Sequence, residues 1–351
     1  MLFRSSGHPR SLVVSERVVI GLDLGTSSLK GVAVAPDGRI ATRAAASYPT
    51  DRRGPGAAEQ VPEDWLVAVG QVVEALARVI PVREWEAVGL SAMLPTLVLA
   101  RTDGTPVAPA VTWEDARAEP EGERLRSAIG GDALYARTGQ WVDGRYLLPA
   151  AVRLRDVTGT ASDPVRILGA KDWLFGRLTG TPATDPSTAA GYGCFDLASG
   201  RWDEEVVGAA GLQDASALPP ILPATHSAPV ISSAATELGL PRGLPVVLGA
   251  ADSVLAARGL GVVDPGRVAY VTGTSTVILG IAPRAVLDPG HRFLVTPLER
   301  PGPVGLEMDL VATGSAIGWL ARLFGYPDGT DRKSTRLNSS NIPLSRMPSS
   351  A

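Results

Sequence analysis

The alternation of apolar and polar residues at the start of the chain predicts two short strands joined by a turn. Residues 18–24 (VVIGLDL) form an apolar run interrupted by one acid, Asp23, and the turn Gly25-Thr26-Ser27 follows. Residues 29–34 are short and partly β-branched, and the turn sequence PDG follows them, which predicts a second strand. A dinucleotide fold or a P-loop requires a helix here, so the pattern argues against both. The backbone N–H groups of the turn can still form an anion-binding nest.

The next segments predict a strand, a helix and then further strands. Residues 39–50 indicate a third strand, and residues 62–80 place apolar side chains three to four positions apart, as on one face of a helix. Residues 85–93 indicate a buried strand, and residues 97–117 indicate a hairpin with an Asp-Gly turn. This order predicts a mixed sheet with helices on its faces.

The opening pattern returns near residue 245, after a more irregular and helical stretch. A strand there leads to a turn of small residues with Asp252 and then to a helix. Residues 266–282 again predict strand, turn and strand, and the turn is Gly273-Thr274-Ser275. Two Gly-Thr-Ser turns in matching contexts predict duplicated domains that hold one phosphate chain from both sides.

Composition narrows the classes of partner. The chain has 351 residues, of which 45% are hydrophobic and 20% charged, so two globular domains are expected. A formal net charge of -3, without a basic stretch in the main body, argues against nucleic acid or a membrane as a partner. The single cysteine, Cys194, excludes an internal disulfide and suits a cytoplasmic location. Residues 1–16 are expected to be a disordered leader.

Five segments together resemble one family, the FGGY carbohydrate kinases of the actin, hexokinase and Hsp70 ATPase superfamily. The resemblance covers roughly residues 17–325 and is carried by GLDLGTSSLKGVAV, GLSAMLPTLVLARTDGTPVAPAVTWEDARA, AKDWLFGRLTGTPATDPSTAAGYGCFD, GAADSVLAARGLG and YVTGTSTVILG. It implies an α/β, ribonuclease H-like fold of duplicated domains with mixed sheets, the second of them incomplete. Residues 17–244 would form the sugar-binding domain, and residues 245–330 part of the nucleotide-binding domain.

The resemblance also implies a reaction, which is phosphoryl transfer from ATP to a hydroxyl of a small-molecule sugar or polyol. Asp252 would be the general base, and Asp23 would help to hold Mg²⁺ through water. The expected phosphate-binding residues are Gly25, Thr26, Ser27, Gly273, Thr274 and Ser275. The expected substrate-binding residues are Asp115, Trp113, Met93 and Leu94. A homodimer is an expectation for the full-length parent.

Each of these residues also has a purely structural interpretation. Asp23 could be a turn residue, Asp252 an N-cap, and Asp115 part of a solvated charge cluster. Lys171 and Asp172 are interpreted as a local surface pair. The remaining structural interpretations are turn residues at Asp185, Pro186 and Ser187 and core tryptophans at Trp65, Trp173 and Trp202.

The chain departs from the family at the sugar-contact segment. Xylulokinases commonly carry Gln-Met-His-Gly where this chain has Met93-Leu94-Pro95-Thr96. Pro95 offers no side-chain hydrogen bond in place of the histidine, so a polar sugar contact is lost. This argues against both xylulose and gluconate and leaves the identity of the sugar open. Two alternatives to a kinase also stay open, a sugar-binding relative without turnover and another actin-like or Hsp70-like ATPase.

The end of the sequence carries a second departure, because the family's glycine-rich adenosine motif does not follow. The chain closes with DRKSTRLNSSNIPLSRMPSSA. Residues 331–340 are what the adapter sequence GATCGGAAGAGCACACGTCTGAACTCCAGT encodes in frame, so residues 331–351 are expected to be a non-native tail and the native part to stop near Thr330. The parent is therefore expected to be a kinase and the chain as written to be inactive, and sugar-dependent ATP turnover by these residues would contradict that expectation.

Overall fold

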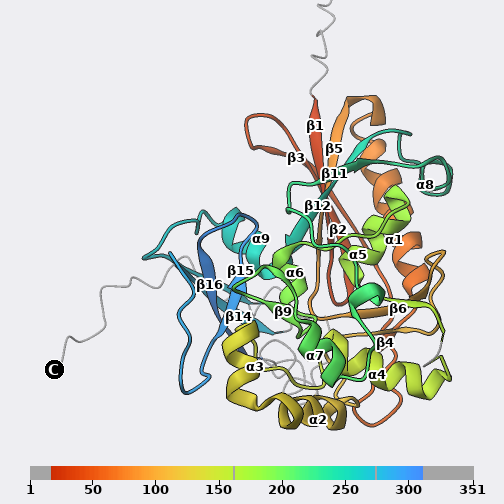
Figure 1. Cartoon of the computed structure of the whole chain (residues 1–351). Helices are drawn as coiled ribbons and strands as arrows, with labels where there is room; N and C mark the ends of the chain where they lie inside the picture. The colour runs from red at the N-terminus through yellow and green to blue at the C-terminus, as the bar shows by residue number, and fades with distance from the viewer. Residues whose placement is uncertain (1–16, 161–162, 273–274, 311–351) are drawn as a thin grey trace, which may run out of the picture.

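A six-stranded mixed sheet forms one part of the molecule. The computed structural model describes residues 17–160, 163–272 and 275–310. In spatial order the strands of this sheet are β11 (Ser227–Pro229), β12 (Pro245–Ala251), β5 (Trp85–Ala92), β1 (Val18–Leu24), β2 (Ser28–Val34) and β3 (Ile40–Ser47). β5 pairs in parallel with both β1 and β12, while β2, β3 and β11 pair antiparallel with their neighbours. The predicted mixed sheet is therefore confirmed (Figure 1).

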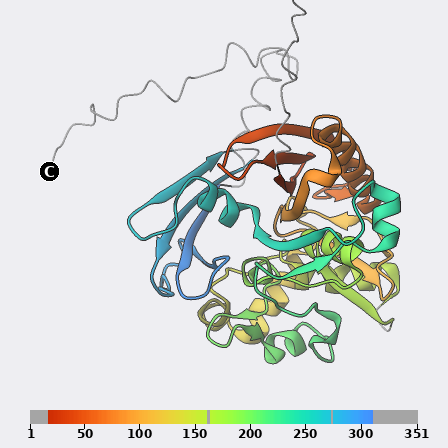
Figure 2. The same cartoon turned by 90° about the horizontal axis from the view of Figure 1, so that it is seen from above.

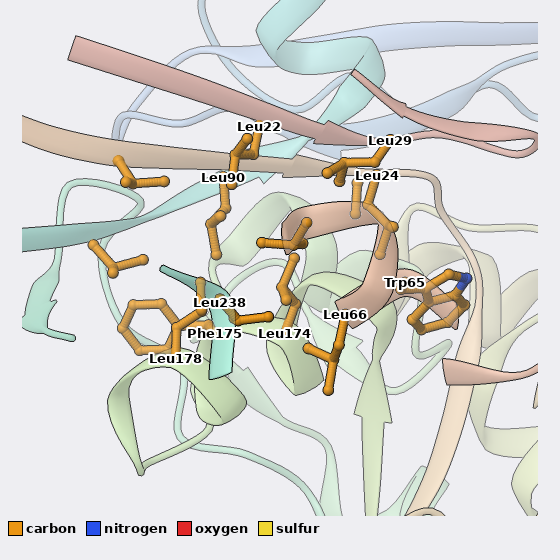
Figure 3. Packing of buried hydrophobic residues seen from close by; sticks show 14 of the residues in the cluster. Leu22, Leu24, Leu29, Trp65, Leu66, Leu90, Leu174, Phe175, Leu178 and Leu238 are labelled. Atoms are coloured by element: carbon orange, nitrogen blue, oxygen red, sulfur yellow. The ribbon is translucent and has the colours of Figure 1, made fainter. Parts of the chain in front are cut away.

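Helices cover one face of this sheet. The helix predicted at residues 62–80 is α1 (Pro62–Ala77), which packs on β2 and β3, and α5 (Ala170–Thr179) packs on β5 and β12. α8 (Ser232–Leu238) contacts both helices. Alternate residues of β1 are buried, so its leucines belong to the same core as the leucines of α5 (Figure 3).

All three tryptophans interpreted as core or packing residues are packed, Trp65 and Trp173 in this core and Trp202 against a second apolar core described below. Trp65 and Trp173 are almost completely buried, and their rings meet edge to face at a centroid distance of 5.8 Å. Trp202 is half-buried and its indole N–H donates to the carbonyl of Pro219 at 3.0 Å. Burial of two large aromatic side chains against the sheet ties α1 and α5 to one core.

A second sheet and a group of helices form the lower part of Figure 1. The strands of this sheet are β4 (Glu59–Gln60), β7 (Ala110–Val111), β6 (Leu97–Arg101) and β8 (Val165–Gly169). A separate apolar core involves α2 (Glu119–Ile129), α3 (Gly131–Thr138), α4 (Leu147–Thr158) and α7 (Glu204–Ala209). The short elements of the described residues are η1 (Val82–Glu84), α6 (Pro186–Ala190), β9 (Phe195–Asp196), β10 (Arg201–Trp202) and η2 (Ala215–Ala217).

A third sheet, antiparallel throughout, lies to one side of the first (Figure 2). Its strands are β13 (Val268–Thr272), β14 (Thr276–Ala282), β16 (Val304–Leu310) and β15 (Leu294–Pro297). α9 (Asp252–Gly259) packs on β13 and β14 and also contacts β12, so it joins this sheet to the first. In the described ranges no helix has both the length and the apolar character that a membrane crossing requires.

The predicted domain boundary at residues 244 and 245 is wrong. β12 lies inside the first sheet, where Val246 pairs with Val88 and Ala251 with Ala92 of β5. Its apolar sequence makes it a central strand, so the first domain extends at least through Ala251. The expected leader at residues 1–16 and the expected tail at residues 331–351 lie outside the described residues.

Gly249 lies where β12 approaches the backbone of β5 too closely for a side chain. Its φ is +71°, and an added Cβ would lie 1.7 Å from the carbonyl oxygen of Leu90, in the backbone of β5. Gly249→Ala is therefore expected to lower the free energy of unfolding by about 2–4 kcal/mol, measured by urea denaturation.

Gly208→Ala is the matched control, because Gly208 is an exposed position of α7 where an added Cβ meets nothing within 4 Å. We expect the control to be neutral or stabilising by roughly 0.5–1 kcal/mol. Equal stability of the two variants would contradict the tight approach of β12 to β5.

Candidate active site

Two adjoining cavities lie beyond the carboxyl ends of β1, β5 and β12. The turn cavity is lined by Asp23, the turn Gly25–Ser27, Lys30 and Ser91 among others. The tryptophan cavity is lined by Trp113 and by residues from all three sheets or their connections. Both cavities share the lining residues Thr26, Asp252, Ser253, Ser275 and Val277. Asp252 therefore faces both spaces at their junction.

Strand register places the polar groups of the turn cavity. Asp23 pairs with Lys30 on β2 and with Ser91 on β5. The Ser91 hydroxyl donates to the Asp23 carboxylate at 3.0 Å, and Lys30 Nζ lies 3.7 Å from its other oxygen. This arrangement puts a carboxylate and an ammonium group side by side at the mouth of the turn.

The Gly25–Ser27 turn is fixed by hydrogen bonds from outside it. The Gln60 amide donates to the Thr26 carbonyl at 2.7 Å, and the Trp113 indole N–H donates to the Thr26 hydroxyl at 3.0 Å. The Tyr48 hydroxyl donates to the carbonyl of Gly25. Because its conformation is set in advance, the turn can bind an anion without further ordering. Of the second turn, Gly273 and Thr274 lie outside the described residues, and Ser275 lines both cavities.

The tryptophan cavity has an apolar wall and a polar wall. The apolar wall contains Met93, Leu94, Pro95 and Trp113, three of which the sequence predicted as substrate contacts. The polar wall contains Gln140, Arg145, Tyr146, Ser187, Glu307 and Asp309. No sequence pattern had indicated any of these as a substrate contact. A lining that combines apolar side chains with placed polar groups is typical of sites that bind a small molecule.

The groups of the polar wall are held by one another and by the neighbouring backbone. The Tyr146 hydroxyl donates to the Gln140 side chain at 3.0 Å, and Gln140 donates to the carbonyl of Val295 at 3.0 Å. The Arg145 guanidinium forms an ion pair with Asp143 at 2.6 Å. Glu307 and Asp309 alternate along β16, a pattern in the sequence from which a shared face could have been predicted.

The carboxylates at the junction have raised pKa values. Burial, and next the negative charge of Asp23, raises the pKa of Asp252 to about 7, although its Oδ1 accepts the Ser253 N–H at 2.8 Å. Burial and the neighbouring charge of Asp309 also raise the pKa of Glu307, and burial raises that of Asp309 against the attraction of Arg145. A buried carboxylate with a pKa near neutrality is suited to accept a proton.

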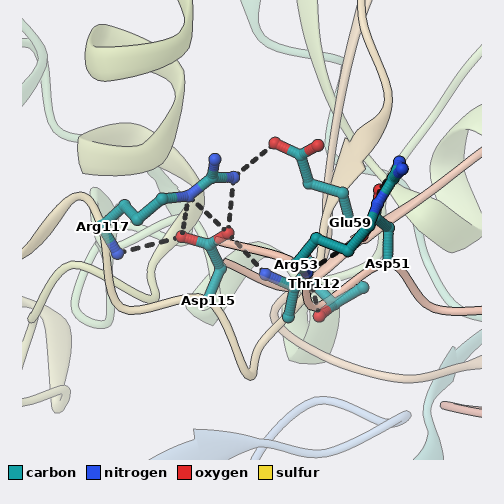
Figure 4. Close-up of polar contacts among 7 residues, drawn as sticks. Asp51, Arg53, Glu59, Thr112, Asp115 and Arg117 are labelled. Atoms are coloured by element: carbon teal, nitrogen blue, oxygen red, sulfur yellow. Dashed lines mark hydrogen bonds and ion pairs between the residues drawn. The ribbon is translucent and has the colours of Figure 1, made fainter. Parts of the chain in front are cut away.

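Asp115, expected to contact the substrate, lies away from both cavities. Its side chain is 2% exposed and does not line either cavity. Figure 4 shows the carboxylate occupied by Arg117, whose Nη2 lies at 2.7 Å, and by the backbone N–H of Ala58 at 2.9 Å. Arg117 in turn contacts Glu59. The prediction that Asp115 accepts substrate hydroxyls is therefore wrong, because its oxygens already accept hydrogen bonds from Arg117 and Ala58. These bonds hold the loop that also carries Trp113.

Lys171 and Asp172 also differ from the expected surface pair. They are 2% and 0% exposed, and Lys171 Nζ lies 3.1 Å from Asp172 and 3.0 Å from Asp185. The two carboxylates hold the pKa of Lys171 above its usual value despite burial. The sequence could not reveal this, because α5 and the loop after it separate Lys171 from Asp185, and only the fold brings the two side chains together.

A metal site of several protein ligands is not present in the described ranges, where no group of three or more His, Cys, Asp or Glu side chains converges. Asp23 and Asp252 both offer a carboxylate to the turn cavity, and Asp23 is the one beside the Gly25–Ser27 turn. One carboxylate together with phosphate oxygens and water matches the way Mg²⁺ binds beside nucleotides. The donor set therefore fits the predicted magnesium, held through Asp23.

Comparison with known proteins agrees with this geometry. The sequence model described as "FGGY family of carbohydrate kinases, N-terminal domain" matches residues 18–259. The xylulose kinase of Lactococcus lactis is 29% identical over 313 residues, which cover 88% of this chain and 62% of the relative. The autoinducer-2 kinase of Escherichia coli is 33% identical over 324 residues, 88% of this chain and 60% of the relative.

A solved structure shows the same fold. The xylulose kinase from Rhodospirillum rubrum superposes with a TM-score of 0.81 at 30% identity, over 89% of this chain and 64% of that one. The chain spans about three fifths of the length of these relatives. With its sheets, its two cavities and the family match over residues 18–259, the chain belongs to the FGGY family of carbohydrate kinases.

Proposed function

We propose that this chain carries the phosphoryl-transfer site of an ATP-dependent kinase that acts on a hydroxyl of a neutral sugar or polyol. The supporting observation is the place of Asp252, which lines the turn cavity and the tryptophan cavity at their junction. A base in that position faces an acceptor hydroxyl in one space and a phosphate chain in the other. A relative named xylulose kinase supports a sugar as the acceptor.

The reaction follows from that arrangement. The phosphates of ATP lie against the Gly25–Ser27 turn with Lys30 near them, and the sugar lies against Trp113. The acceptor hydroxyl donates a hydrogen bond to the Asp252 carboxylate. As its oxygen bonds to the γ-phosphorus, the bond to the β-phosphate oxygen breaks with its electron pair, and the proton passes to Asp252. The products are the sugar phosphate and ADP.

Magnesium would be held by Asp23, whose carboxylate the Ser91 hydroxyl orients at 3.0 Å. When bound, the ion offsets negative charge on the phosphates. Asp23 and Lys30 are opposite charges on neighbouring strands, 3.7 Å apart. Lys30 can therefore orient the carboxylate before the nucleotide enters and then contact a phosphate oxygen.

Charge in the tryptophan cavity favours a neutral substrate. Asp252, Glu307 and Asp309 contribute carboxylates, and Arg145 is the one cation among the described lining residues. Arg145 is already paired with Asp143 at 2.6 Å. An aldonate such as gluconate would bring a further carboxylate to this wall without a free cation to receive it, and like charges repel strongly at a partly buried site.

The first test is ATP turnover stimulated by added sugars, with these 351 residues and with the protein expressed from its native gene. Asp252→Asn is expected to lower kcat/KM by at least about 100-fold, because it removes the proton acceptor. In the unaltered protein, kcat/KM should rise with pH through about 7 as Asp252 loses its proton. Asp156→Asn, an exposed change on α4, is the control and should leave turnover unchanged. Full activity of Asp252→Asn would contradict the proposal.

The second test measures substrate charge. Neutral pentuloses and polyols are expected to bind at least about tenfold more tightly than aldonates in calorimetric titrations, because of repulsion from the carboxylate wall. Asp309→Asn should reduce that preference while leaving affinity for neutral compounds nearly unchanged. Tighter binding of an aldonate to the unaltered protein would refute the neutral-substrate assignment.

The third test uses the linkage between stability and pH. The folded-state pKa of Asp252 is about 7 against 3.8 for an ordinary aspartate, so its destabilising effect is absent below pH 4 and grows as pH rises to 7. Asp252→Asn removes this effect and should raise the free energy of unfolding by up to about 4 kcal/mol at pH 8, with little gain at pH 4. Urea denaturation at both pH values measures the difference, with Asp156→Asn as control. An increase in the free energy of unfolding that does not depend on pH would contradict the raised pKa of Asp252.

A further inference from the structure

The end of β12 has an edge that no strand of the described residues covers. β11 pairs with β12 only from Pro245 to Val247. After Val247 the acceptors are loop carbonyls. The carbonyl of His226 accepts the N–H of Leu248 at 2.8 Å, and the carbonyl of Ala224 accepts the N–H of Gly249 at 2.9 Å. The N–H of Ala251, directly before Asp252, therefore needs an acceptor from elsewhere, since buried backbone donors are almost always paired.

That acceptor is a side chain. The hydroxyl oxygen of Ser187 in α6 accepts the Ala251 N–H at 3.0 Å. The same hydroxyl donates its proton to the carboxylate of Asp185, the N-cap of α6. Ser187 is completely buried, so this pair of bonds sets the hydroxyl in one orientation.

Asp185 is itself fixed by a buried charge. Lys171 Nζ lies 3.0 Å from its Oδ1, and the Thr188 hydroxyl donates to the same oxygen at 2.6 Å. Lys171 also contacts Asp172, which accepts the Tyr192 hydroxyl at 2.6 Å. A buried ion pair contributes little net stability and costs much desolvation, so its best-attested benefit is a fixed geometry.

We propose that Lys171, Asp185 and Ser187 form a positioning chain that holds the Ala251 peptide and so fixes the Asp252 carboxylate between the two cavities. This inference rests on the proposed function, because it assigns these three residues to the orientation of the same base. Lys171 and Asp185 do not line either cavity, so they act through the backbone and not on a ligand. Ser187 lines the tryptophan cavity but uses its hydroxyl within the chain.

The test compares Ser187→Ala with Ser187→Thr, which restores a hydroxyl, in the protein expressed from its native gene. Loss of the acceptor should lower kcat by about 10- to 100-fold, because small displacements of a catalytic group carry that effect. KM for ATP should stay within about twofold, since the turn cavity is untouched. Hydrogen exchange at the Ala251 amide should become faster in Ser187→Ala and return toward the original rate in Ser187→Thr.

Two further variants separate positioning from simple loss of stability. Lys171→Met should lower kcat in the same direction as Ser187→Ala without a change in KM for ATP. Thr179→Val is the matched control, because the Thr179 hydroxyl is also buried and donates only to nearby carbonyls of α5 and its end. It should lower thermal stability without affecting kcat or exchange at Ala251. If Lys171→Met does not fold, the two Ser187 variants decide the question.

The outcomes distinguish this inference from the proposed function. If Asp252→Asn abolishes turnover while Ser187→Ala keeps kcat within about twofold and leaves the Ala251 amide protected, the positioning chain is refuted and the base stands. If Asp252→Asn itself retains full turnover, the proposed function fails, and exchange at Ala251 then reports only on the hydrogen bond.

Discussion

Parallel pairing of β5 with both β1 and β12 is the constraint on which the site depends. In a parallel arrangement the carboxyl ends of the strands meet at one edge of the sheet, where ligands of open α/β sheets bind. Asp23 near the end of β1, Ser91 on β5 and Asp252 after β12 reach that edge from distant parts of the sequence. The absence of a side chain at Gly249 permits this pairing, because the side chain of any other residue would clash with the backbone of β5.

The carboxylates that line the tryptophan cavity destabilise the folded protein. Asp252, Glu307 and Asp309 line the same cavity, and the cation among the described lining residues, Arg145, is paired with Asp143. The consequence is a set of carboxyl groups with raised pKa values. Such local conflict is expected at functional sites, where a group with the required pKa is retained although it weakens the fold.

Local patterns in the sequence were sufficient for part of the fold. Period-two and helical spacing predicted β1, β2, β3, α1 and β5, and the resemblance predicted the family that the match over residues 18–259 confirms. The roles of Asp23 and Asp252 remain proposals, although both residues line the turn cavity as expected.

The errors share a physical cause, which is dependence on side-chain and strand contacts that only the fold determines. The sheet to which β12 belongs is set by its partner β5, and the burial of Lys171 is set by Asp185. The environment of Asp115 depends on Arg117, which lies beside it in sequence, and also on Ala58 and Glu59 across the corner. A single sequence shows charges and spacing, but it does not show which charges the fold brings together.

The central proposal places Asp252 between an acceptor hydroxyl and a phosphate chain. A crystal structure of the protein from its native gene with a non-hydrolysable ATP analogue, Mg²⁺ and a neutral pentulose or polyol tests this most directly. We expect a sugar hydroxyl hydrogen-bonded to Asp252, with the ring or chain against Trp113 and the γ-phosphate facing that hydroxyl from the Gly25–Ser27 turn. A sugar bound away from Asp252, or phosphates bound outside the turn cavity, would contradict it.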